Sequence, residues 1–198
     1  MTFRFGLKLR PLCLRPKVQR LRSSVDRWGV GARWLHWGML LLYGASISLG
    51  FYMVDLPLGF AKYRAYTLHK SLGISLLVLI GVRSLWRLID AAPISVVSSR
   101  WQSVAARIVR VAFYIVMWVM PLSGWLYNSA AGFPLQWFGY IHLPALVESN
   151  PHIKILAKDV HVGAVYVLMC LLCVHVAAAG KRHWIDRDGT WQRMAPFL

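Results

Sequence analysis

Four long apolar runs, separated by polar segments, organise the chain. They cover about 34–54, 66–86, 111–131 and 160–180. A helix of roughly 20 residues is about 30 Å long, which matches the thickness of the hydrocarbon core of a membrane. The pattern therefore predicts an all-α protein, an integral membrane four-helix bundle.

The polar segments divide the chain into three regions. We expect a basic N-terminal tail at 1–33, a four-helix transmembrane domain at 34–180 and a C-terminal tail at 181–198. The longest connection between the predicted spans, about 132–157, is rich in proline and aromatic residues. Pro121 lies inside the third run, where we expect it to kink the helix.

The composition and the placement of charge agree with a membrane protein. Hydrophobic residues make up 58% of the 198-residue chain and charged residues 15%, against roughly 45–50% and 25% in soluble domains. The net charge of +16 comes from basic residues that flank the apolar runs, and they form no groove-reading motif, which argues against a nucleic-acid partner. Eighteen of the 23 basic residues fall on the side that holds both chain ends. The positive-inside rule then predicts that both termini are cytoplasmic.

The N-terminal tail has no acidic residue before Asp26. An organellar transit peptide has a similar composition but is rich in serine, whereas 1–33 holds only two serines and one threonine. A cytoplasmic tail or an over-extended start is therefore favoured. The sequence leaves open whether residues 1–27 are removed.

The most informative residues are four histidines near the ends of apolar runs: His36, His69, His161 and His175. An ionisable side chain inside a membrane is costly to place there and indicates function. His36 and His175 lie at the cytoplasmic depth, and His69 and His161 at the external depth. The 14 residues from His161 to His175 rise about 21 Å and complete nearly four turns, so both rings leave one face of one helix.

Two planar cofactors stacked across the membrane would fit these pairs. Imidazole commonly binds haem iron, and two histidines fill both axial positions, which favours electron transfer over oxygen activation. Two alternatives stay open. Any one histidine could instead form a hydrogen bond to a neighbouring helix, and zinc would need more ligands than each depth offers. Seven glycines on the spans would let helices or a porphyrin approach closely, although glycine is common in such helices: Gly38, Gly44, Gly50, Gly73, Gly81, Gly124 and Gly163.

Charged side chains at the same depths are candidates for contact with haem propionates. These are Arg33 and Arg83 on the cytoplasmic side and Lys70 and Lys158 on the external side. Snorkelling to the membrane surface is the alternative, and it is favoured for Arg83. Lys158, one helical turn before His161, is the best candidate for an external polar contact.

The remaining histidines and the cysteines are given no ligand role. An odd cysteine count argues against a disulfide framework. Cys170 and Cys173 lack the directly following histidine of a c-type haem site, so we expect small apolar core residues. Three histidines are expected in solvated segments: His142, His152 and His183. His142 could line an external substrate site.

The histidines and their neighbours resemble the bacterial cytochrome b561 family over about 27–196. The motifs that carry the resemblance are Arg33-Trp-Leu-His36-Trp, Leu68-His69-Lys-Ser-Leu-Gly-Ile-Ser75, His161-x13-His175 and Asp186-x-Asp-Gly-Thr-x-x-Arg-Met194. The resemblance implies a bacterial inner-membrane protein with two b-type haems. His36 and His175 would be the ligands of the cytoplasmic haem, and His69 and His161 those of the external haem.

The resemblance also implies a function in electron transport. Family members move single electrons between quinone and an outer partner, and one branch is similar to a superoxide oxidase that reduces ubiquinone. We therefore expect a di-haem cytochrome in contact with membrane lipid, ubiquinone and an external donor or superoxide, with oxidoreductase activity favoured. The alternatives are a membrane-anchor subunit of a larger dehydrogenase or hydrogenase, and a small histidine-relay transporter. The transporter is disfavoured because the acids lie at span ends.

Overall fold

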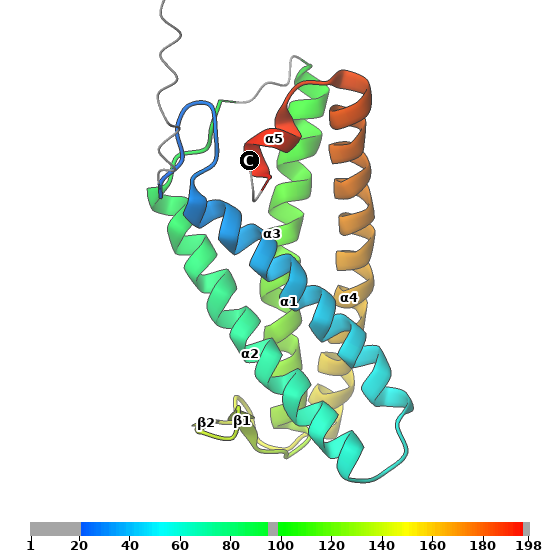
Figure 1. The fold of residues 1–198 in the computed structure, drawn as a ribbon. Helices are drawn as coiled ribbons and strands as arrows, with labels where there is room; N and C mark the ends of the chain where they lie inside the picture. Colours follow the sequence, from blue (N-terminus) through cyan, green and yellow to red (C-terminus); the bar gives the residue numbers. More distant parts are fainter. Residues whose placement is uncertain (1–20, 95–98, 196–198) are drawn as a thin grey trace, which may run out of the picture.

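Four long antiparallel helices form the body of the protein (Figure 1). The computed structural model describes residues 21–94 and 99–195, so most of the predicted N-terminal tail and Cys13 lie outside the described residues. The helices are α1 Val30–Asp55, α2 Phe60–Ile89, α3 Arg100–Ala130 and α4 Pro151–Gly180. Each is long and apolar enough to cross a membrane. The predicted all-α architecture with four apolar helices is confirmed.

Short elements close the two ends of this bundle. An antiparallel hairpin of β1 Leu135–Trp137 and β2 Ile141–Leu143 lies between α3 and α4 in sequence. After α4, the π-helix η1 Lys181–Asp186 leads to α5 Thr190–Met194. The hairpin end and the terminal end, where the described chain begins and finishes, are opposite ends of the bundle (Figure 1).

The connection between α3 and α4 is shorter than the sequence pattern predicts. α4 begins at Pro151, several residues before the expected start, because Asn150 caps it. The Asn150 side-chain oxygen accepts hydrogen bonds from the backbone N–H groups of His152 and Ile153, at 2.9 and 3.2 Å. Asparagine at the N-cap and proline in the first turn are both favourable for a helix start.

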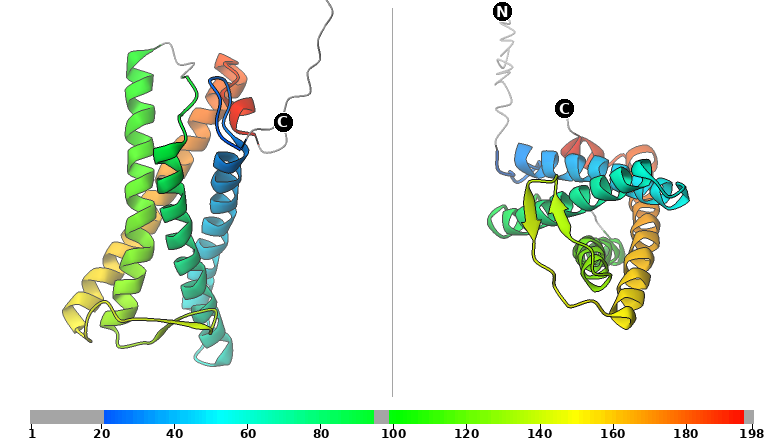
Figure 2. Two further views of the ribbon diagram at one scale, coloured as in Figure 1. Left: turned by 90° about the vertical axis from the view of Figure 1, so that its left-hand side faces the viewer. Right: turned by 90° about the horizontal axis from the view of Figure 1, so that it is seen from below.

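The helices pack as two neighbouring pairs, α1 with α2 and α3 with α4, and α2 joins the pairs by packing against α3 (Figure 2). The centre of the bundle is apolar and rich in methionine; its buried members include Met39, Leu76, Ile80, Met117, Met120 and Leu168. Many large apolar side chains point outward instead, as in Leu41, Ile108 and Val174. Outward apolar side chains suit a lipid surrounding.

Serines of α2 hold the hairpin against the bundle. The Ser71 hydroxyl accepts a hydrogen bond from the Phe138 backbone N–H at 3.0 Å, and the Ser75 hydroxyl accepts one from Trp137 Nε1 at 3.0 Å. Lys70 Nζ donates to the Pro134 carbonyl at 3.2 Å. The hairpin is therefore fixed beside the helical turn that carries His69.

A buried carboxylate organises the terminal end. Asp90, which caps α2, is 3% exposed. Its two oxygens accept hydrogen bonds from the Ser23 backbone N–H and hydroxyl at 2.8 and 2.6 Å, and from Trp86 Nε1 at 3.2 Å. These bonds satisfy the carboxylate inside the protein and tie the segment before α1 to the end of α2.

Candidate functional site

The four predicted histidines meet in two pairs. At the terminal end, the ring centroids of His36 from α1 and His175 from α4 are 6.1 Å apart. At the hairpin end, those of His69 from α2 and His161 from α4 are 6.2 Å apart. α4 thus contributes one ring to each pair, and α3 contributes none.

The spacing within each pair fits a metal centre held between two imidazoles. A metal–imidazole bond of about 2.0 Å on each side, with roughly 1 Å more from nitrogen to ring centre, places two axial ring centroids about 6 Å apart. Both pairs have this spacing. Within the described ranges no three His, Cys, Asp or Glu side chains gather into a metal site. Each pair therefore supplies two ligands, which suits the axial positions of a haem better than a closed zinc site.

Backbone carbonyls orient the two rings at the hairpin end. His69 Nδ1 lies 3.0 Å from the Ser46 carbonyl oxygen, and His161 Nδ1 lies 2.8 Å from the Met120 carbonyl oxygen. A carbonyl oxygen can only accept, so each Nδ1 must be the donor. In the neutral ring, Nε2 then keeps its lone pair for a metal.

Two glycines lie directly beneath these rings. A Cβ atom at Gly50 would be 3.2 Å from His69 Cε1, and one at Gly124 would be 3.0 Å from His161 Cε1. Both distances are shorter than ordinary van der Waals contacts, so any larger residue would push the ring away. The sequence pattern does not distinguish these two glycines from the five others on the predicted spans.

The pair at the terminal end has different surroundings. Neither the His36 nor the His175 ring takes part in a hydrogen bond with any described residue. Aromatic rings flank the pair instead: Trp37 lies 5.4 Å from His36 and Phe113 lies 5.5 Å from His175, measured between centroids. The Arg83 guanidinium is near enough to both imidazoles to act on them electrostatically.

The C-terminal segment packs against α1 beside His36. Trp37 Nε1 donates to the Met194 carbonyl at 2.9 Å, and its ring lies 6.1 Å from that of Trp191. Arg33 is buried, and its Nη1 donates to the Ala195 carbonyl at 2.9 Å. The predicted polar tail is thus packed against the residue that follows His36.

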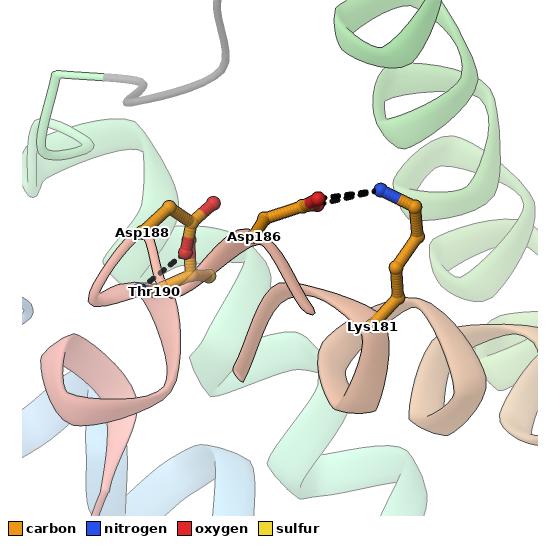
Figure 3. Close-up of polar contacts among 4 residues, drawn as sticks. All are labelled: Lys181, Asp186, Asp188 and Thr190. Carbon is orange, nitrogen blue, oxygen red and sulfur yellow. Dashed lines mark hydrogen bonds and ion pairs between the residues drawn. The ribbon is translucent and has the colours of Figure 1, made fainter. Parts of the chain in front are cut away.

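Local contacts give this segment its shape (Figure 3). Lys181 and Asp186, at the two ends of η1, form an ion pair with a distance of 2.7 Å. The Asp188 carboxylate accepts a hydrogen bond from the Thr190 backbone N–H at 2.8 Å, where α5 begins. Gly189 between them has a φ of 75°, which glycine adopts readily. The closing sequence motif therefore encodes a fold-back.

The other histidines considered as candidates lie apart from the pairs. His142 contacts Gln136 across the hairpin, with 2.8 Å between their Nε2 atoms. His183 packs beside Trp191, and His152 is exposed at the start of α4. None of the three rings joins a histidine pair.

Two further predictions concern side chains of α4. Cys170 and Cys173 are free and exposed, so the expectation that they are core residues is wrong. An exposed position on a membrane-spanning helix suits a small apolar side chain equally well, because lipid takes the place of the core. Lys158 is exposed one turn before His161, and its amine has no partner in the described part of the chain.

Comparison with known proteins identifies the family. The family model described as prokaryotic cytochrome b561 matches residues 27–197. The chain belongs to the prokaryotic cytochrome b561 family. Cytochrome b561 homolog 2 of Escherichia coli (strain K12) is 32% identical over 174 residues, which cover 87% of this chain and 93% of that protein. Cytochrome b561 homolog 1 of the same organism is 30% identical over 96 residues, covering 48% and 54%.

Membership makes this chain a membrane cytochrome. The family implies b-type haem and electron transport, and four helices of membrane-spanning length agree with a membrane location. The two histidine pairs fit such a cofactor in spacing and in donor chemistry.

Proposed function

We propose that this cytochrome b561 carries single electrons through the bacterial inner membrane on two b-type haems. His36 and His175 would hold one haem, and His69 and His161 the other. Each haem supplies a one-electron change at its iron. The observation that carries the proposal is the occurrence of two histidine pairs, one near each end of the bundle, with centroid spacings of 6.1 and 6.2 Å.

The protein's own groups would set the conditions for this transfer. With two of these histidines engaged as ligands of each iron, dioxygen would find no free position, so the centres would pass electrons rather than activate oxygen. The apolar core between the pairs, which includes Met39 and Leu168, keeps water from the interior. Because α4 holds one ring of each pair, it fixes the separation of the centres at about 21 Å along its axis.

We further propose the direction and the partners. The excess of basic residues at the terminal end supports a cytoplasmic position for both termini, which places the hairpin end outside. Ubiquinone in the membrane is the proposed acceptor. Superoxide is the proposed external donor, because the exposed amine of Lys158 near His161 would attract a small anion.

Optical spectroscopy of the purified protein tests the haem content. We expect the reduced-minus-oxidised spectrum to show α and Soret bands, and the pyridine haemochrome to give two b-type haems per chain. A colourless protein from haem-replete cells would refute the proposal.

Single histidine variants test the pairing. His36→Ala and His175→Ala should each remove the same haem, and His69→Ala and His161→Ala should each remove the other. His142→Ala, in the hairpin, serves as the control and should keep both haems. Loss of the same haem on changing His36 and His69 would contradict the assignment.

A further inference from the structure

The ring of His69 is seated on α1 by two groups one helical turn apart. Its Nδ1 donates to the carbonyl of Ser46 at 3.0 Å. Its Cε1 lies over Gly50, four residues later, where a Cβ atom would come within 3.2 Å. The Ser46 hydroxyl, at 3.5 Å from Nδ1, is too far away to compete with the carbonyl.

The ring of His161 is seated on α3 in the same way. Its Nδ1 donates to the carbonyl of Met120 at 2.8 Å. Its Cε1 lies over Gly124, again four residues later, where a Cβ atom would come within 3.0 Å. Two different helices thus offer the same combination of a carbonyl at one position and a glycine four positions on.

Helix geometry explains why the combination works. A helical carbonyl points toward the residue four positions later, so a ring from a neighbouring helix reaches it by passing beside that residue. The Met120 carbonyl also accepts a hydrogen bond from the Ser123 hydroxyl at 2.9 Å. Any side chain there would block a ring approaching from a neighbouring helix. At four other glycines of the spans, an added Cβ atom would meet nothing within 4 Å: Gly38, Gly44, Gly73 and Gly163. Close approach to an imidazole is therefore specific to Gly50 and Gly124 among the described glycines.

We propose that Gly50 and Gly124 are positioning residues that tune the haem at the hairpin end. They admit the His69 and His161 rings to backbone carbonyls, and the resulting Nδ1–H bonds make Nε2 a stronger electron donor to iron. Stronger axial donors stabilise ferric iron and lower the reduction potential of that centre. The inference rests on the proposed function, because it assumes that these rings bind haem.

The second histidine pair provides an internal reference. Neither the His36 nor the His175 ring forms a hydrogen bond among residues 21–94 and 99–195. The reduction potential of the haem that they would hold is therefore not lowered by a bond from Nδ1 to a backbone carbonyl. A change at Gly50 or Gly124 should alter one centre and leave the other unchanged. A general disturbance of the bundle would alter both centres.

The experiment compares Gly50→Ala and Gly124→Ala with Gly38→Ala in the purified haem-loaded protein. Gly38 is on the same helix as Gly50, has open space where a Cβ atom would lie and is two residues from His36, on the opposite helix face. The readouts are haem stoichiometry, a potentiometric titration and the low-spin ferric EPR spectrum. His36→Ala and His69→Ala supply single-haem reference signals.

We expect each of the two test variants to raise the potential of the hairpin-end haem, shift its EPR signal or release it selectively. The other haem should keep its potential and signal, and Gly38→Ala should match the wild type. Equal changes in both haems, or no change in either, would overturn the inference. If the Gly124→Ala protein does not accumulate, Gly50→Ala decides the question, because its added Cβ atom would lie farther from the histidine ring. A wild type without two haems would refute the proposed function instead.

Discussion

At the scale of single residues, the proline inside α3 is compensated by a neighbouring helix. Pro121 has no N–H group, so the Met117 carbonyl loses its usual helical partner. The Tyr43 hydroxyl of α1 donates to that carbonyl at 3.0 Å. Tyr43 is buried, at 6% exposure, so the bond satisfies two groups that water does not reach. A proline in a membrane helix is tolerated when a neighbouring group forms a hydrogen bond with the carbonyl that the proline leaves without a partner.

Removing the hydroxyl should therefore destabilise the bundle. We expect Tyr43→Phe to lower the free energy of unfolding by about 0.5–2 kcal/mol, the range measured for hydrogen bonds between membrane helices. The measurement is unfolding in a titration with sodium dodecyl sulfate, followed by circular dichroism.

A double-mutant cycle isolates the cause. Pro121→Ala restores an N–H group that can bond to the Met117 carbonyl, so Tyr43→Phe should cost less in that background. An equal cost in both backgrounds would mean that the tyrosine contributes through packing alone.

At the scale of elements, the segment after α4 folds back onto α1. η1 and α5 turn the chain back so that Met194 and Ala195 present carbonyls to Trp37 and Arg33. Trp37 follows His36 directly and also contacts the Trp191 ring. The segment therefore packs on α1 directly beside His36.

Shortening the chain after Asp186 should remove the contacts beside His36 and let water approach that ring. Water stabilises the more highly charged ferric centre, so we expect the potential of the terminal-end haem to fall while that of the hairpin-end haem stays constant. Potentiometric titration measures both. Trp37→Phe, which loses the bond to Met194 and part of the ring contact with Trp191 but keeps the segment, should give a smaller change of the same sign. An unchanged potential in the shortened protein would show that the segment does not control solvent access.

At the scale of the whole molecule, charge is distributed unevenly. Eighteen of the 23 basic residues belong to the terminal side by sequence, yet the few at the hairpin end include Lys158, whose amine has no partner among the described residues. Lys70, by contrast, donates to the Pro134 carbonyl. Of these two lysines, Lys158 is therefore the one better able to influence an approaching anion.

Reversing this charge tests whether Lys158 attracts superoxide to the protein. Lys158→Glu should reduce the rate of superoxide-driven ubiquinone reduction by roughly 3- to 10-fold at low ionic strength, and added salt should shrink the difference. Arg100→Glu, at the opposite end, makes the same charge change and should leave the rate unaltered. Equal rates for Lys158→Glu and wild type at low salt would rule out steering by this residue.

The sequence predicted the elements with strong periodic signals. The four helices and the meeting of the histidines in two pairs follow from apolar run length and from depth along the helices, which depend on local geometry alone. The predicted start of α4 lies too late in the chain because it rests on hydropathy and leaves out the helix cap formed by Asn150 and Pro151. Local polar cues of this kind decide boundaries more directly than hydropathy does.

Apart from the histidine pairs, contacts between segments distant in sequence were beyond prediction. Nothing in the pattern around Gly50 and Gly124 separates them from the other span glycines, because their role depends on which neighbouring ring faces them. The fold-back of 187–195 was likewise interpreted as a polar tail, since its carbonyl contacts involve no apolar periodicity. The hairpin was missed because three-residue strands leave no alternation to detect.

Because α4 carries one histidine of each pair, the number of residues between these two histidines is constrained. Inserting or deleting one residue between His161 and His175 would swing one ring by about 100° and displace it by about 1.5 Å, so neither partner helix could follow. The connecting segment at 144–149 carries no such restriction. A length change there would leave the spacing of His161 and His175 unaltered, whereas within α4 even the smallest indel would separate one ring from its partner.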